Sequence, residues 1–159
     1  MNKVLILKND RTGDLFTSLK TINLIFNKHK NNIIEIFLSK VNYKFRFLFR
    51  NKKIKILNIN LDFFDKSKLI NYFLFNNIET VYILTPKNFY FYLPLIFFYK
   101  KIKFYGICID ARNKRPNNFL RKFLFKKVII NRIDIKKRRS TYEMQQDLIE
   151  QNSNVSNLI

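Results

Sequence analysis

The feature that most constrains the fold is the stretch Lys3–Phe16, where an apolar run passes through a short polar turn into a helical pattern. Val4–Leu7 is short, uninterrupted and rich in branched side chains, which is typical of a strand buried on both faces of a parallel sheet. Residues 10–13 break this pattern, and apolar residues recur at helical spacing from Leu15 onward. We therefore expect a strand followed by a helix that begins at or just before Asp14.

The same alternation continues along the rest of the chain. Short apolar runs typical of strands alternate with longer stretches that accept helices, and the connections between them are short. The expected strands are Ile33–Leu38, Ile54–Ile59, Thr80–Leu84, Lys103–Ile109 and a last short run at Val128–Ile130. The expected helical stretches are Val41–Arg50, Phe64–Asn76, Asn88–Lys100, Asn118–Lys126 and a closing helix at Ser140–Glu150. Repeated strand-then-helix order predicts an α/β fold with a parallel sheet, flanking helices and right-handed crossovers.

Length and composition indicate one domain. The chain has 159 residues, 47% of them hydrophobic, which is enough for one substantial core. We expect a single domain over residues 1–150 and a polar tail over residues 151–159, either a frayed end or the start of a linker. The single cysteine, Cys108, excludes an internal disulfide and is expected to be a buried structural thiol. The four apolar residues before Lys8 are too few for a signal peptide, so we expect a cytoplasmic protein.

The most apolar segment is Phe89–Tyr99, which Pro94 interrupts. Its length is about half of the roughly 20 residues that a membrane-spanning helix needs, so we do not expect it to cross a bilayer. Two interpretations remain open. The segment is either a helix buried against the sheet, which we favour, or an aromatic surface that dips into a membrane interface.

The formal charge of +20 is the strongest compositional signal. A charge of this size normally points to nucleic acid, an anionic membrane or an acidic substrate as the partner. The abundant residues Lys, Asn, Ile, Phe and Tyr are also those encoded by A/T-rich codons, so codon bias accounts for part of the charge. The basic run Lys136–Arg139 is expected to be a solvated surface patch. A protein that binds single-stranded nucleic acid is one alternative, and it predicts aromatic side chains exposed on a sheet face.

Candidate functional residues gather just after the first strand. Ligands of open α/β sheets bind beyond the carboxyl ends of the strands, where Lys8, Arg11, Thr12 and Asp14 form one polar cluster. A carboxylate in a first helical turn is favoured by the helix dipole and by free backbone N–H groups, so Asp14 is either a capping residue or a functional group. Gly13 is one of two glycines in the chain, and we expect a backbone requirement at its position.

Missing motifs exclude several common sites. The sequence has no G-x-G-x-x-G and no G-x-x-x-x-G-K-[ST], so the backbone cradle of common nucleotide sites is absent. His29 and Cys108 are single and far apart in the sequence, which argues against a zinc site, and no serine triad can be built around that histidine. No Asp-x-Asp pair is present, and Asp62 and Asp65 are expected to cap the helix that follows them. We therefore expect neither a metal nor a cofactor.

The arrangement of Lys8, four further residues and then Gly13 and Asp14 opening a helix resembles the N-terminus of the heptosyltransferases of glycosyltransferase family 9. Those enzymes transfer heptose from an ADP-sugar to a lipid-linked acceptor in the inner core of lipopolysaccharide, with two Rossmann-like domains facing one cleft, the GT-B arrangement. The resemblance implies that Asp14 is the general base and that Lys8 holds acidic acceptor groups. It places Arg11, Thr12 and Gly13 beside them as substrate-binding residues.

The resemblance extends weakly to the far end of the chain. The family has a strand that ends in a glycine, a polar segment with an arginine, and a helix that carries a histidine. Here these features correspond to Tyr105–Ile107, to residues 110–116 and to the closing helix, where Tyr142 stands in place of the histidine. Either Arg112 or Arg115 would be the matching arginine that contacts the substrate.

The resemblance implies an acceptor-side half enzyme, namely the Rossmann-like N-terminal half of a GT-B glycosyltransferase whose donor site lies in a separate C-terminal domain. The reaction would be a metal-independent inverting transfer, with a nucleotide-sugar, expected to be an ADP-sugar, as a substrate rather than a cofactor. The acceptor would be a glycolipid or an acidic saccharide, and peripheral contact with the inner membrane would fit it. We expect nucleic acid not to be a partner. The alternatives are a small basic nucleic-acid-binding protein and a noncatalytic remnant.

Overall fold

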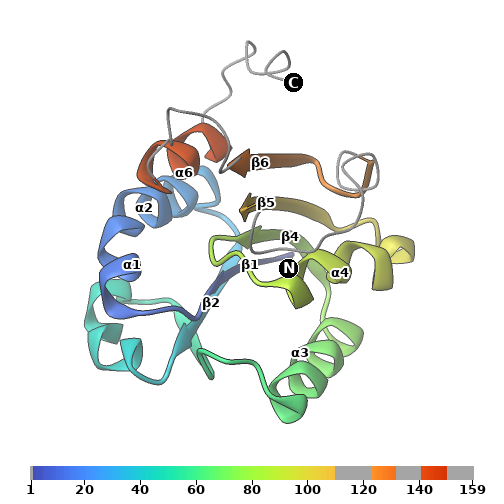
Figure 1. Cartoon of the computed structure of the whole chain (residues 1–159), viewed down its shortest axis with the longest axis horizontal. Coiled ribbons are helices and arrows are strands. Elements are labelled where there is room, and N and C mark those ends of the chain that lie inside the picture. The colour runs from blue at the N-terminus through green and yellow to red at the C-terminus, as the bar shows by residue number, and fades with distance from the viewer. Residues whose placement is uncertain (1, 110–122, 132–140, 150–159) are drawn as a thin grey trace.

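A computed structural model of the chain describes residues 2–109, 123–131 and 141–149 (Figure 1). The described strands are β1 (Lys3–Lys8), β2 (Ile33–Ser39), β3 (Lys53–Leu57), β4 (Ile78–Ile83), β5 (Lys103–Ile109) and β6 (Lys127–Asn131). The described α-helices are α1 (Thr12–Thr17), α2 (Leu19–Lys28), α3 (Phe63–Phe75), α4 (Asn88–Ile96) and α6 (Thr141–Ile149). Two 3-10 helices, η1 (Asn42–Phe49) and η2 (Phe98–Lys100), complete these elements. Most of the expected helix Asn118–Lys126, the basic run Lys136–Arg139 and the tail 151–159 lie outside the described residues.

The described strands form one parallel sheet in the order β3-β2-β1-β4-β5-β6. The chain builds from β1 through β2 to β3, then returns to the other side of β1 with β4 and continues outward through β5 to β6. The order therefore reverses between β1 and β4, which is the topological switch point of a Rossmann-like fold. At the centre, Ile6 pairs with Ile36 on one side and with Tyr82 on the other. The predicted α/β class with a parallel sheet is confirmed.

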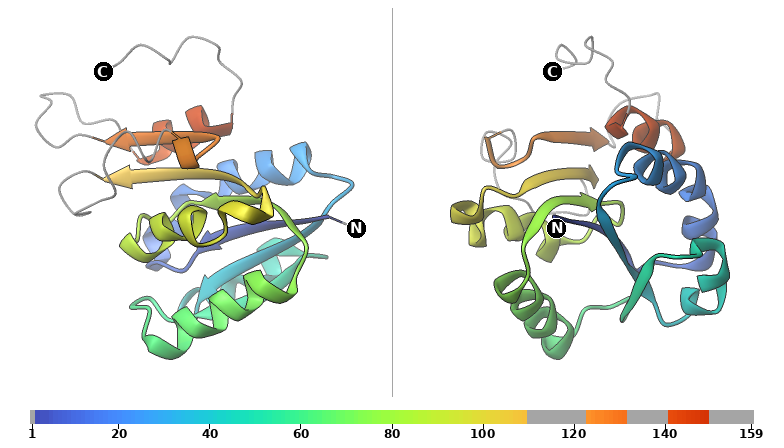
Figure 2. Two further views of the ribbon diagram at one scale, coloured as in Figure 1. Left: turned by 90° about the vertical axis from the view of Figure 1, so that its right-hand side faces the viewer. Right: turned by 180° about the vertical axis from the view of Figure 1, so that it is seen from behind.

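Helices cover both faces of the sheet, so its central strands are buried on both sides (Figures 1 and 2). One hydrophobic core joins the strands to α1, α2, η1 and α6, and the other joins them to α3 and α4. The aromatic strand residues Phe37, Tyr82 and Phe104 lie inside these cores. The described strands therefore lack the exposed aromatic face that the nucleic-acid alternative predicts.

The first helix differs from its prediction at Ser18. The apolar spacing predicts one continuous helix, but the structure has α1 and α2 in succession, with Ser18 between them at φ −95° and ψ −6°. The Ser18 hydroxyl donates to the Asp14 carbonyl at 2.8 Å. A serine that bonds back to the carbonyl four residues earlier commonly bends a helix, which explains the interruption. The predicted cap at Asp62 is confirmed, because its carboxylate accepts a hydrogen bond from the Asp65 N–H at 2.7 Å.

The apolar segment 89–99 forms α4 and η2, and one side of it is buried while the other is exposed. Tyr90, Phe91, Leu93 and Phe97 are buried against the sheet, as the favoured interpretation predicts. The opposite side of the same segment is exposed and also apolar. No helix among the described residues is long and apolar enough to cross a membrane.

The two glycines have different surroundings, and neither has a positive φ. A Cβ at Gly106, in β5, would lie 2.8 Å from the Phe125 ring and 3.6 Å from the Phe91 ring, so close packing requires a glycine there. A Cβ at Gly13 would meet no atom of the described chain within 4 Å. The expected backbone requirement at Gly13 is therefore not found in the conformation or packing of the described chain.

Candidate functional site

Three loops meet beyond the carboxyl ends of the strands, around the switch point. They follow β1, β3 and β4 and comprise residues 9–11, 58–62 and 84–87. The first loop is anchored to the end of β2, because Ser39 Oγ and Asn42 Nδ2 each donate to the Asp10 carbonyl at 2.8 Å. The backbone before the first helix is thus fixed by neighbouring side chains.

Lys8 ends β1 inside this edge of the sheet. Its side chain is 1% exposed, and its Nζ donates to Asp10 Oδ2 at 2.6 Å. The same oxygen accepts from Thr85 Oγ1 at 3.1 Å, whereas Asp10 Oδ1 is buried with no partner in the described chain. Burial raises the pKa of Asp10; the charge of Lys8 and the bonds from Lys8 and Thr85 oppose the rise, and the charge of Asp14 adds to it. Both carboxylates follow the end of β1 and lie at the same edge of the sheet.

A second set of bonds joins the loops after β1 and β3 to each other and to α3 and α4. Asn9, which is fully buried, donates to the Asn58 carbonyl at 2.7 Å and accepts from the Tyr90 hydroxyl at 2.6 Å. The Asn58 N–H donates to Asp65 Oδ2 at 3.0 Å. Burial, with smaller effects from Asp65 and Asp10, raises the pKa of Tyr90 well above its usual value, so its hydroxyl stays a proton donor. This hydrogen-bond network holds the two loops rigidly at the carboxyl edge of the sheet.

Asp14 lies in the first turn of α1 with its side chain exposed. The helix begins without a side-chain cap, and no hydrogen bond or ion pair joins the Asp14 carboxylate to the described part of the chain. Its backbone carbonyl accepts from Thr17 Oγ1 at 2.9 Å and from Ser18 Oγ at 2.8 Å. Ser18 Oγ in turn accepts from Gln145 Nε2 of α6 at 2.8 Å. The backbone of Asp14 is thus fixed through Ser18 by Gln145 of α6. The Asp14 carboxylate itself remains available to solvent or a ligand.

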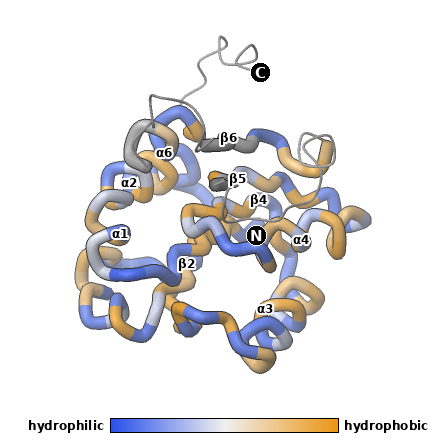
Figure 3. Tube along the Cα trace, viewed as in Figure 1, coloured by the Kyte–Doolittle hydropathy of each residue, from blue (hydrophilic) through white to orange (hydrophobic). Residues whose placement is uncertain are grey.

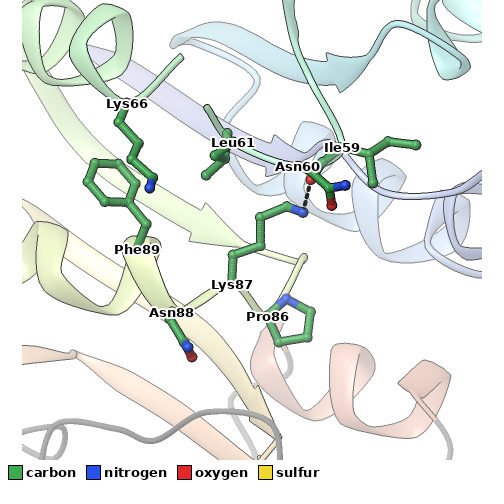
Figure 4. A pocket seen from close by; sticks show the side chains of 8 residues that line it. All are labelled: Ile59, Asn60, Leu61, Lys66, Pro86, Lys87, Asn88 and Phe89. Carbon is green, nitrogen blue, oxygen red and sulfur yellow. Dashed lines mark hydrogen bonds between the residues drawn. The ribbon is translucent and has the colours of Figure 1, made fainter. Parts of the chain in front are cut away.

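An open cleft of about 390 Å³ lies between the loops that follow β3 and β4 (Figure 4). Residues 59–61 and Lys66 line one side of it, and residues 86–89 line the other. Lys87 Nζ donates to the Ile59 carbonyl across the cleft. Lys66 Nζ lies 5.9 Å from the centroid of the Phe89 ring, within the range of a cation–π contact.

The cleft combines two ammonium groups with amide side chains and an aromatic ring. Neither Lys66 nor Lys87 has an ion pair with a carboxylate in the described chain. Burial lowers the pKa of Lys87, and the charge of Asp10 partly offsets this, so the cleft is electrostatically connected to the switch point. Asn60 and Asn88 supply amide groups on opposite sides. These groups suit a polar, anionic ligand with a flat apolar side.

The structure brings together the predicted cluster of Lys8, Arg11, Thr12, Gly13 and Asp14, because all belong to the β1 end and the first turn of α1. Within the cluster Lys8 is buried and paired, whereas Arg11, Gly13 and Asp14 are exposed and Thr12 is half-buried. The predicted Arg112 and Arg115 lie outside the described residues, and nothing is described of the side chains of Tyr142 and Cys108.

Sequence reasoning missed several residues that shape this edge, namely Asn9, Asp10, Ser18, Lys87 and Gln145. Asp10 adjoins the predicted cluster, and a carboxylate two residues after a strand-end lysine was an available signal. Gln145 had none, because its partner lies 127 residues away in the sequence. Among the described residues no group of three or more His, Cys, Asp or Glu side chains is placed to hold a metal ion.

Comparison with known proteins shows similarity at the level of the fold. No protein-family model matches the sequence, and no curated protein sequence does so significantly. The structure is similar to E. coli heptosyltransferase WaaC solved with ADP, with a TM-score of 0.54 and 14% identity over 92% of this chain. It is equally similar to the same enzyme solved with ADP-2-deoxy-2-fluoro heptose, at a TM-score of 0.54 and 11% identity. The chain covers 45% and 47% of those chains, so it spans about half their length.

Proposed function

We propose that this chain is the acceptor-side domain of a heptosyltransferase-like glycosyltransferase. The observation that carries the proposal is the exposed Asp14 carboxylate, which is unpaired in the described chain and is placed at the switch point by a fixed backbone. The similarity of fold to one half of a heptosyltransferase supports it, and so does the Gly13-Asp14 motif. The donor domain would be a separate partner.

In the proposed reaction Asp14 removes the proton from an acceptor hydroxyl while that oxygen attacks the anomeric carbon of an ADP-sugar. The bond from the anomeric carbon to the diphosphate oxygen breaks as the new glycosidic bond forms, which inverts the configuration. Asp14 keeps the proton and ADP leaves with the electron pair of the broken bond. The departing diphosphate needs positive groups and N–H donors, which we assign to the partner domain. The transfer needs no metal and no cofactor.

The acceptor in this proposal is an acidic saccharide, such as the head of a glycolipid. The buried ammonium of Lys8 is already paired with Asp10, so the cleft lysines Lys66 and Lys87 are better placed than Lys8 to meet an acidic group. Arg11 is exposed on the other side of the switch point and has no ion pair in the described chain. The open space beside Gly13 lets a ligand approach the backbone next to Asp14.

The test is ADP release from an ADP-sugar in the presence of an acidic saccharide acceptor, by this chain together with a heptosyltransferase donor domain supplied as a separate polypeptide. Because general-base catalysis contributes about 10²–10⁴-fold, Asp14→Asn should lower kcat by about that factor. The exposed position of Asp14 should leave thermal stability unchanged. Glu79→Gln, at a half-buried carboxylate on β4 far from the carboxyl edge, is the control and should turn over normally. Normal turnover by Asp14→Asn would remove the general-base assignment.

A further inference from the structure

The end of α3 and the α4–η2 segment together expose an apolar surface far from the proposed site. It consists of six large side chains, which we call the amino-edge patch: Leu74, Phe75, Leu95, Ile96, Phe98 and Tyr99. Phe75 is 85% exposed and Phe98 is 73% exposed. Figure 3 shows how strongly hydrophobic residues dominate α4 and the segment after it. A helix that is apolar on all sides is normally buried by protein or another partner, but the outer side of α4 is exposed in this chain.

The patch is a single surface built on a rigid base. Lys100 Nζ donates to the carbonyls of Phe73 and Leu74 at 2.6 Å each, which ties η2 to the end of α3. The Phe73 and Phe97 rings stack beneath it with centroids 5.0 Å apart. Phe98 and Tyr99 meet edge to face at 6.1 Å on its outer side. The exposed rings therefore project from packed neighbours and need no rearrangement to insert into a partner.

The charges around the patch indicate which partner it fits. Lys100 and Lys101 border it directly, and Lys103 follows them at the start of β5. Glu79 is already paired with Lys103 at 3.3 Å. With a formal charge of +20 on each chain, a second copy would be repelled, whereas an anionic surface would be attracted. Aromatic and aliphatic side chains bordered by lysines are the combination that binds at the surface of anionic bilayers.

We propose that the amino-edge patch docks this protein on an anionic lipid bilayer. Phe75, Phe98 and Tyr99 insert among the headgroups, and Lys101 contacts lipid phosphates. The patch lies where α3 and η2 end and β4 and β5 begin, whereas Asp14 and the cleft lie where strands end, so they are at opposite edges of the sheet. Docking here leaves the carboxyl edge uncovered. This proposal does not depend on glycosyl transfer.

The absence of tryptophan from the chain makes a direct test possible. Phe98→Trp places a single tryptophan in the patch, and Phe64→Trp places one at a site of similar exposure, 80%, at the carboxyl edge. The probe is vesicles of equal parts phosphatidylcholine and phosphatidylglycerol with brominated acyl chains. On addition of these vesicles, the tryptophan emission of Phe98→Trp should shift to shorter wavelength and be quenched by the bromines. The emission of Phe64→Trp should show neither change. Pure phosphatidylcholine vesicles should leave both unchanged.

Other outcomes would overturn the proposal. Vesicle binding without quenching of Phe98→Trp would mean that the basic surface adsorbs by charge alone. Stronger quenching of Phe64→Trp would place the docking surface at the carboxyl edge. A spectral shift of Phe98→Trp without lipid, together with a dimer in sedimentation equilibrium, would assign the patch to a second copy. As an independent check, Phe75→Ser/Phe98→Ser should lose vesicle cosedimentation, and Phe63→Ser/Phe64→Ser should keep it.

Discussion

The Lys8–Asp10 pair provides the sharpest test of how the carboxyl edge is held together. The two groups are 2.6 Å apart, with side-chain exposures of 1% and 14%. At an effective dielectric constant of about 20, unit charges at that distance attract by about 6 kcal/mol. Desolvation of the two ions, at several kcal/mol each, offsets most of this attraction. The pair is therefore close to neutral for stability as a whole, but each partner alone would be an uncompensated charge.

We predict that Asp10→Asn lowers the free energy of unfolding by about 3–5 kcal/mol, because it leaves the Lys8 ammonium buried without a counter-charge. Lys8→Met should cost a similar amount at alkaline pH but less at acid pH. The physical reason is that the Asp10 carboxyl can neutralise itself by protonation, and burial already raises its pKa. Lys8→Met/Asp10→Asn should cost less than the sum of the two single changes by at least about 2 kcal/mol.

Urea unfolding followed by far-ultraviolet circular dichroism measures these four proteins at two pH values. The Lys103–Glu79 pair is the matched control, with a separation of 3.3 Å and exposures of 53% and 36%. Breaking that surface pair by Lys103→Met should cost less than about 1 kcal/mol. Burial does not make this pair critical if Asp10→Asn lowers the free energy of unfolding no more than Lys103→Met does. The same conclusion follows if the effects of Lys8→Met and Asp10→Asn on that free energy simply add.

The remaining predictions concern two glycines, one buried bond and one histidine. In urea unfolding, Gly106→Ala should lower the free energy of unfolding by about 1–3 kcal/mol, because the added methyl group overpacks against Phe125. Gly13→Ala should raise it by up to about 1 kcal/mol, because alanine fits the open space there and restricts the unfolded chain. Gln145→Met should cost about 1 kcal/mol through its lost bond to Ser18, and thermal unfolding would show no change if that bond is unimportant. Burial, then Lys28, lowers the pKa of His29, so stability should fall as pH drops below about 6.5, and His29→Asn should flatten this slope.

The sheet could be predicted from the sequence because its signals are local. Val4–Leu7 and the other strand runs owe their β structure to short apolar segments between breakers, and each strand needs only its own residues to be recognised. The start of α1 and the cap at Asp62 are also local signals. The break at Ser18 was missed because the apolar spacing continues across it without a gap. The cause is one hydroxyl bonded to a carbonyl, which periodicity does not detect.

The candidate site was predictable in position but not in the state of its groups. Strand order places Lys8 and Asp14 at one edge, and that much follows from the parallel topology. Whether Lys8 faces a ligand or a buried carboxylate depends on Asp10 and on Thr85, which lies in the loop after β4, 75 residues after Asp10. The anchoring of Asp14 through Ser18 and Gln145 depends on α6 packing on α2, a contact that no local pattern encodes.

The carboxyl edge and the amino edge of the sheet carry different kinds of surface groups. At the carboxyl edge, the buried Lys8 and Asp10 neutralise each other, and the Asp14 carboxylate is unpaired in the described chain. At the amino edge, α3 and η2 end in apolar residues next to lysines, and the glutamates Glu35 and Glu79 are paired with Lys3 and Lys103. A ligand at the carboxyl edge therefore meets a specific carboxylate, whereas a partner at the amino edge meets a general cationic and apolar surface. The two proposals place glycosyl transfer and lipid attachment at opposite ends of the same strands, so Phe98→Ser should reduce vesicle binding without changing the kcat that depends on Asp14.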